Sequence, residues 1–209
     1  EASRQAKGKA IVNLLNLSQD ETVTAYIPVK EFDAAHYLIM ATKNGTVKKT
    51  NLIAYSNPRS NGIIAITFNQ NDELINVKLT DGSKEIILAT KNGIAVRFNE
   101  NNIRATGRSS QGVRGITLKD NDMVIGMVVA SENKTLLTVT ENGYGKRTEI
   151  SDYRLISRGG SGVRNIICSE RNGNVVSINS VAENDDIILI SQKGIVIRIS
   201  SSQISVIGR

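Results

Sequence analysis

The amino-acid sequence predicts an all-β, propeller-like protein assembled from units of about 50 residues, each with roughly four short strands. Two sets of recurring glycines, together with the apolar runs beside them, lead to this prediction. Glycines of the first set each follow an asparagine or a lysine, and they are Gly45, Gly93, Gly143 and Gly194. Those of the second set follow polar stretches, and they are Gly8, Gly62, Gly112 and Gly162. Neighbours within a set are 48 to 54 residues apart, so the chain repeats.

Each glycine of the first set lies between two strand-like runs. The runs that precede it are aliphatic or β-branched and read "YLIMAT", "EIILAT", "TLLTVT" and "DIILIS". The turn itself is Asn-Gly in three units and Lys-Gly in the fourth. A two-residue hairpin needs positive φ, which these residues adopt most readily. The sequence therefore predicts four β-hairpins.

Two further strand patterns complete each unit. The glycines of the second set precede short apolar runs such as "IIAITF", "VRGITL" and "VRNIIC", and a polar turn then enters another run such as "NDELINVKL". We find no apolar stripe with helical spacing over a dozen residues. These spacings predict one domain over residues 1–209, with blades of approximately 8–61, 62–111, 112–161 and 162–209. The final "ISVIGR" aligns with "IRATGR" at 103–108, so we expect a fragment of a longer array.

Composition places the chain among cytosolic proteins. Its single cysteine, Cys168, cannot form an internal disulfide, and a lone thiol fits a reducing compartment. We expect this residue to act as a small buried hydrophobe in the strand "NIIC". No apolar run approaches the length of about 18 residues that a membrane helix needs.

We find no set of residues arranged for catalysis. The one histidine, His36, has no partner at ligand spacing, and we expect it to enter a strand as a polar residue. Acidic pairs such as Asp185 and Asp186 precede strands and are typical of solvated turns. The glycine-rich "SRGGSGV" at 157–163 lacks the pattern of a phosphate-binding loop. The sequence predicts neither a catalytic residue nor a metal site.

Positive charge recurs at fixed places in each unit. The net charge is +6, and the segments 45–59, 93–114, 143–164 and 194–209 together hold 14 Lys or Arg but only 3 Asp or Glu. A cation stands four residues after each turn glycine, and further arginines flank the glycines of the second set. We expect these cations to form a belt around a curved body. The candidate residues are Lys48, Lys49, Arg59, Arg97, Arg104, Arg108, Arg114, Lys146, Arg147, Arg158, Arg164 and Arg198.

A belt of this kind favours a polyanionic partner, and duplex DNA supplies phosphates at regular intervals along its length. With no Trp, three Phe and five Tyr, the chain is poorly supplied for stacking on single strands. The alternative is a protein-interaction scaffold whose cations only keep exposed strands soluble. Because surface substitutions usually cost little, we expect alanine at Lys49, Arg97, Arg147 and Arg198 together to leave the fold intact.

Several long motifs, "KGKAIVNLLNL", "MATKNGTVKKT", "RATGRSSQGVRGI" and "TENGYGKRTEI", closely resemble the C-terminal domain of the DNA gyrase A protein. The resemblance covers the whole chain, and the related domain of topoisomerase IV is the alternative. It implies a β-pinwheel, in which neighbouring blades share strands, with a basic perimeter that binds, bends and wraps duplex DNA independently of sequence. The catalytic tyrosine, the metal-binding acids and the ATPase site of that enzyme lie in other parts.

The resemblance also implies partners and limits. The fragment would need no cofactor, while the holoenzyme, an A2B2 assembly with the gyrase A N-terminal core and gyrase B, would use Mg and ATP for negative supercoiling in the bacterial cytoplasm. The family normally has about six blades and an Arg/Gly-rich heptapeptide called the gyrase box. Neither the full number nor that heptapeptide is found in this sequence. We therefore expect DNA binding or bending with incomplete wrapping.

Overall fold

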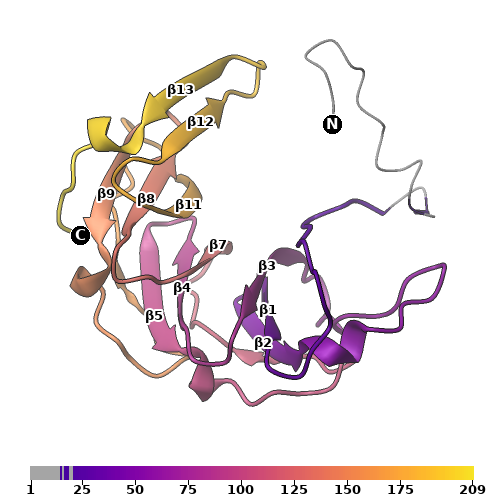
Figure 1. The fold of residues 1–209 in the computed structure, drawn as a ribbon. Helices are drawn as coiled ribbons and strands as arrows, with labels where there is room; N and C mark the ends of the chain where they lie inside the picture. The colour runs from indigo at the N-terminus through magenta and orange to yellow at the C-terminus, as the bar shows by residue number, and fades with distance from the viewer. Residues whose placement is uncertain (1–14, 16, 19–20) are drawn as a thin grey trace, which may run out of the picture.

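A computed structural model describes residues 15, 17–18 and 21–209. It is an all-β structure in which the sheets follow one another along an open arc (Figure 1). The helices in the described part are short 3-10 segments of three or four residues, and none is long and apolar enough to cross a membrane. The predicted fold class is therefore confirmed.

All four predicted hairpins are present. The turns are not of the predicted two-residue type, because three residues, 43–45 and 91–93, separate the strands of the first two hairpins. In each of the four turns only the glycine lies in the left-handed region, with a φ between +80° and +83°. The registers follow from the turn, so that Ala41 pairs with Val47 and Ala89 with Ala95. The hairpins are β1 (Tyr37–Thr42) with β2 (Thr46–Asn51), β4 (Glu85–Thr90) with β5 (Ile94–Asn99), β8 (Thr135–Thr140) with β9 (Gly145–Glu149), and β12 (Asp186–Ile190) with β13 (Val196–Ser200).

Further strands extend the first two hairpins on both sides and the third hairpin on one side. The inner strands β3 (Leu74–Thr80), β7 (Val124–Val129) and β11 (Val175–Val181) pair with the first strand of a hairpin and lie on the concave side of the arc (Figure 1). The two-residue outer strands β6 (Val113–Arg114) and β10 (Val163–Arg164) pair with the second strand. The resulting sheets are β3-β1-β2-β6, β10-β5-β4-β7, β11-β8-β9 and β12-β13.

The outer strands interlock the sheets. Strand β6 begins the sequence unit that starts at residue 112, yet it closes the sheet of the first hairpin, and β10 does the same for the second hairpin. The unit boundaries at 62, 112 and 162 therefore run through sheets, and neighbouring blades share strands. Short parallel bridges add to the interlocking, because Lys49 pairs with Ala105 and Arg97 with Leu155 in the following connection.

Each core lies between two successive sheets. The first contains Ile39 and Val47 from one sheet and Leu88 and Phe98 from the next. A second core packs the next two sheets around Tyr153, and a smaller one lies beneath β12 and β13. The fold is thus stabilised by contacts between adjacent sheets along the arc, as in repeat proteins. The 3-10 helices η2 (Leu52–Tyr55), η3 (Glu100–Asn102), η4 (Ile150–Asp152) and η5 (Ser201–Gln203) follow the hairpins.

Candidate nucleic-acid interface

The segments that follow η2, η3 and η4 run along the convex side of the arc (Figure 1). We call residues 56–66, 103–116 and 153–166 the outer connections. The residues just after η3 and η4 lie parallel beside β2 and β5, through the bonds from Thr106 N to Lys49 O at 2.9 Å and from Ile156 N to Arg97 O at 3.0 Å. They cover the strand edges where the hairpin cations stand.

Two hairpin cations bind groups within the protein through their charged atoms. Lys49 is 5% exposed, and its Nζ lies 3.0 Å from a carboxylate oxygen of the fully buried Glu100. The Nε of Arg97 donates to Glu85 at 2.7 Å, and its Nη1 donates to the carbonyls of Ile150 and Tyr153 at 3.0 and 3.1 Å. Each side chain therefore stabilises its blade, and Arg97 ties it to the next connection.

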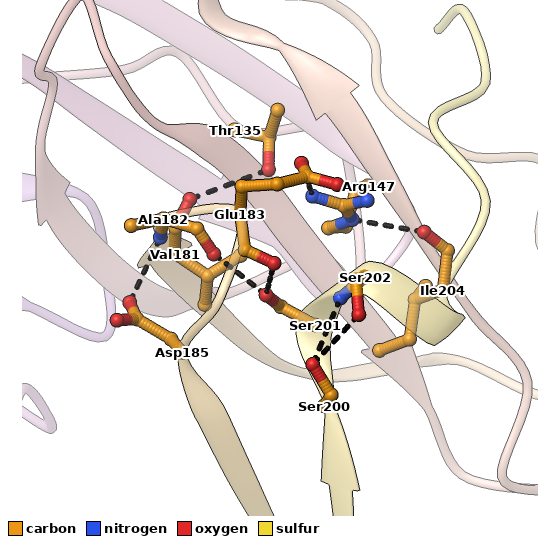
Figure 2. A network of polar contacts seen from close by, with 10 residues as sticks. All are labelled: Thr135, Arg147, Val181, Ala182, Glu183, Asp185, Ser200, Ser201, Ser202 and Ile204. Atoms are coloured by element: carbon orange, nitrogen blue, oxygen red, sulfur yellow. Dashed lines mark hydrogen bonds and ion pairs between the residues drawn. The ribbon is translucent and has the colours of Figure 1, made fainter.

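Arg147 repeats the arrangement of Arg97 (Figure 2). Its Nε donates to the carbonyl of Ile204 at 2.9 Å, just beyond η5, and its Nη1 donates to Glu183 at 2.8 Å. The arginine holds the pKa of the Glu183 carboxyl below its usual value through this hydrogen bond and its charge. Because the guanidinium is 3% exposed, it joins β9 to the last 3-10 helix rather than facing solvent.

Two lysines next to these cations are buried as well. The Nζ of Lys48 donates to the carbonyls of Ala65, at 2.7 Å, and Arg108. Burial, with the Arg108 charge as a second cause, lowers the pKa of Lys48 to about 8. The Nζ of Lys146 donates to the carbonyl of Gly208 at 2.6 Å, and burial lowers its pKa too. Both ammonium groups satisfy main-chain oxygens of a neighbouring segment.

The prediction that the hairpin cations are displayed on the surface is therefore wrong for most of them. Successive side chains of a strand point to opposite faces of its sheet. Here other segments cover both faces, so Lys48 and Lys49 are both buried. Arg97 is partly covered, whereas Arg198 is 71% exposed and pairs with Asp186 at 2.5 Å. The buried members are Lys48, Lys49, Lys146 and Arg147.

The outer connections present the remaining predicted arginines. None of the three contains an aspartate or a glutamate. Within the described residues, no ion pair involves the exposed arginines of these segments. The exposed arginines are Arg59, Arg104, Arg114, Arg154 and Arg164.

Arg108 and Arg158 are half-buried and brace the same segments. Arg108 Nη1 donates to the carbonyl of Ile64 at 2.8 Å, and 50 residues later Arg158 Nη1 donates to the carbonyl of Arg114 at 3.0 Å. Arg158 Nε also donates to the carbonyl of Asn102 at 2.8 Å. These bonds fix successive outer connections against each other, which holds the exposed arginines in a repeated position.

Sequence reasoning missed Arg154. It lies 50 residues after Arg104, at the same point of the next outer connection, and it is exposed. The repeat spacing alone was sufficient to find it. Charge spacing could not separate this exposed pair from the buried hairpin cations, because both sets recur with the same period.

The other residues considered for chemistry have structural surroundings. His36 precedes β1, and its Nδ1 lies 2.7 Å from Asp33. Cys168 packs against the second core, and burial raises the pKa of its thiol. Across residues 15, 17–18 and 21–209, no three His, Cys, Asp or Glu side chains gather in a way that could hold a metal ion.

A family model described as the DNA gyrase C-terminal domain, beta-propeller, matches residues 1–30, 36–81, 84–131, 134–181 and 185–209. The chain belongs to this family. It is 48% identical to the DNA gyrase A protein of Salmonella typhimurium and 54% identical to that of Halalkalibacterium halodurans. Both comparisons include all 209 residues, which span 24% and 25% of those relatives, so the chain is about a quarter of their length.

Solved structures of the family share this architecture. A DNA gyrase A C-terminal domain matches with a TM-score of 0.86 at 29% identity, over 98% of this chain and 69% of the other. The C-terminal domain of DNA topoisomerase IV matches with a TM-score of 0.90 at 27% identity, over 97% and 64%. The higher identity to the two gyrase A proteins favours gyrase over topoisomerase IV.

Proposed function

We propose that this chain binds duplex DNA along the convex side of its arc, without regard to sequence, and bends and wraps it as a gyrase A C-terminal domain. The observation that carries the proposal is the recurrence of exposed arginines on acid-free outer connections. Arg104 and Arg154 are one unit apart, and so are Arg114 and Arg164. Phosphates recur along a duplex, and each one that a cation neutralises releases counterions, so repeated unpaired arginines on a curved surface suit this ligand.

The burial of most hairpin cations supports proposing the contacts on the outer connections instead. The hairpin cations Lys49, Arg97 and Arg147 hold the blades together, and the outer connections present the charge. Arg108 and Arg158 contribute by bracing these connections. Arg59 and Arg198 are exposed and remain proposed contacts at the two ends of the series.

The test is the salt dependence of binding to a long relaxed duplex. A variant with glutamine at Arg104, Arg114, Arg154 and Arg164 is compared with a control that loses four charges elsewhere. The control carries glutamine at four exposed cations outside the outer connections, which are Lys30, Lys119, Arg171 and Lys193. Both variants have the same net charge.

Each phosphate contact contributes about −0.9 to the slope of log K against log salt. Loss of four contacts would flatten the slope by about 3.6, whereas the control should keep most of it. Equal slopes in both variants would move the DNA track to another surface. Absence of DNA binding by the unaltered chain would favour the protein-interaction scaffold.

Finer proposals follow from the family. We propose that the domain works beside the gyrase A N-terminal core and the gyrase B protein in an A2B2 assembly, in the bacterial cytoplasm. ATP and Mg would be used by those other parts in negative supercoiling. The similarity to gyrase A proteins supports this placement. Supercoiling of a relaxed plasmid by a gyrase A whose own C-terminal domain is replaced with this chain tests it, with the arginine variant as the negative control.

A further inference from the structure

A cavity of about 320 Å³ lies among the three inner strands β3, β7 and β11. These strands are on the concave side of the arc, away from the outer connections (Figure 1). Strand β3 contributes Lys78 to the lining, the end of β7 contributes Val129, the turn after it contributes Lys134, and β11 contributes Ser180. No aspartate or glutamate of the described residues lines this cavity. We call it the inner cavity.

Lys78 is directed from the first sheet toward the second. It pairs with Ile39 of β1, and directly opposed residues of an antiparallel pair share a face of the sheet. Because Ile39 belongs to the core between these two sheets, Lys78 lies on the side of that core. The equivalent position in the second sheet is apolar, since Val128 pairs with Ile87 there. Lys78 is half-buried, yet it takes part in no ion pair of the described residues.

Lys134 lacks the acidic partner that its counterpart in the preceding unit possesses. The sequence "DGSK" at 81–84 lies 50 residues before "SENK" at 131–134. In the earlier unit the Nζ of Lys84 lies 2.8 Å from a carboxylate oxygen of Asp81. In the later unit the position of Asp81 is taken by Ser131, and no ion pair among the described residues involves Lys134. The adjacent Glu132 is exposed and lines a different cavity.

Ser180 adds a hydroxyl group without a partner. It pairs with Leu136, which belongs to the core between the second and third sheets, so Ser180 is directed toward the second sheet from the other side. Its Oγ is buried and makes no hydrogen bond to any described residue. Native proteins rarely leave a buried polar atom unpaired. A change of the χ1 rotamer alone would turn this hydroxyl to the cavity, where a ligand would supply the missing partner.

We propose that the inner cavity binds a small anion that carries a phosphate group. A phosphate group has a charge of about −1.5 to −2 at pH 7, which matches two ammonium groups, whereas a single carboxylate would neutralise only one of them. Lysine binds phosphate as a compact point charge, without the paired geometry that arginine offers to a carboxylate. The cavity volume is at the lower limit of ligand pockets, about 300 to 1,000 Å³, and suits phosphate with at most a small organic group.

The bound anion would join three successive sheets. Lys78 comes from the first sheet, Lys134 from the turn between β7 of the second sheet and β8 of the third, and Ser180 from the third sheet. A ligand that binds the folded chain but not the unfolded chain stabilises the fold by mass action. The Tm of the unaltered chain should therefore rise with phosphate concentration. Because the cavity and the outer connections lie on opposite sides of the arc, this effect is independent of DNA binding.

The first test is calorimetric titration with inorganic phosphate and with glycerol phosphate, a phosphate monoester, at constant ionic strength. We expect one saturable site with a Kd of about 1 mM or lower. Lys78→Gln together with Lys134→Gln should weaken binding at least about tenfold, because two charged donors are lost. The matched control carries Lys84→Gln and Lys119→Gln, which remove the same charge outside the cavity. It should bind within about twofold of the unaltered chain, since distant charges are screened.

The two probes and the two variants decide the outcome. Tighter binding of glycerol phosphate than of inorganic phosphate would identify a monoester as the ligand, and equal or weaker binding would identify free phosphate. Equal weakening in both variants would place the bound phosphate on another surface and overturn the proposal. Absence of saturation by either probe up to about 20 mM would overturn it as well.

A second test uses Ser180→Ala and is informative even if the lysine variant fails to fold. The substitution removes a hydroxyl that has no hydrogen-bond partner among the described residues, so the Tm without phosphate should stay the same or rise. Phosphate affinity should nevertheless fall about threefold to tenfold, because the hydroxyl donates to the anion. A residue with only a structural role would not separate these two measurements. Unchanged phosphate affinity in Ser180→Ala would contradict the proposed site.

Discussion

The buried pair of Lys49 and Glu100 predicts that a hairpin cation acts on stability rather than on DNA. The Nζ of Lys49 lies 3.0 Å from Glu100, whose carboxylate is fully buried and also accepts bonds from Thr80 Oγ1 at 2.8 Å and from the backbone N–H of Lys84 at 2.7 Å. Lys49→Met keeps the aliphatic stem but removes the charge. It leaves a buried carboxylate without its cation.

Breaking a buried ion pair from one side typically costs about 3 to 5 kcal/mol. Glu100 retains two neutral hydrogen-bond donors, which places the expected loss near the lower limit, about 3 kcal/mol. For a chain of this size such a loss lowers Tm by roughly 6 to 12 °C. The double variant Lys49→Met with Glu100→Gln removes both charges, and it should recover about half of the loss or more.

The assay is urea or thermal unfolding followed by circular dichroism, together with DNA binding at a temperature where every variant is folded. The salt slope of binding should stay unchanged in Lys49→Met. A stability loss below about 1 kcal/mol with a clearly flattened salt slope would refute the reasoning, because it would mean that Lys49 reaches the phosphates. The double variant serves as the control for the buried carboxylate.

Three further predictions concern a buried hydroxyl, a buried ammonium group and two turn glycines. Tyr153→Phe removes the hydroxyl that donates to Asn165 at 2.6 Å, and urea unfolding should show a loss of about 1 to 2 kcal/mol; an unchanged midpoint would contradict this. The pKa of Lys48 is lowered to about 8 in the fold from 10.5, so the folded protein gains stability as pH rises from 8 to 10.5. The unfolding free energy of the unaltered chain minus that of Lys48→Met should therefore increase over that range, and a constant difference would contradict the lowered pKa. Gly93→Ala should destabilise the protein far more than Gly143→Ala. Both variants strain a residue at positive φ, but only the alanine at position 93 also clashes with a backbone oxygen. Equal Tm values for the two variants would refute this difference.

The structure changes one expectation about the hairpin cations. The sequence alone predicts that alanine at Lys49, Arg97, Arg147 and Arg198 together leaves the fold intact. Three of these side chains bind buried or main-chain groups, and only Arg198 is exposed. We now expect the fourfold variant to be strongly destabilised, and it is unsuitable for testing DNA contacts.

Local sequence predicted the hairpins because each is specified by neighbouring residues, a left-handed turn between apolar runs. It did not predict the pairing of β6 with β2, because a two-residue strand has no periodicity and its partner lies far away in the chain. The burial of Lys48 and Lys49 escaped prediction for the same reason. Alternation along a strand indicates that their side chains point in opposite directions, but not that connections from later units cover both of them.

The interlocking of sheets by outer strands sets an order for synthesis on the ribosome. The first hairpin is complete once residue 51 has been made, but its sheet stays open at β2 until Val113 and Arg114 have emerged. The sheet of the second hairpin likewise stays open at β5 until Val163 and Arg164 have emerged. Each nascent sheet thus carries an unsatisfied edge while about one further unit is translated, and exposed edges of this kind are prone to pair with other chains. Slower translation through the outer connections therefore lengthens the time for which each edge is exposed.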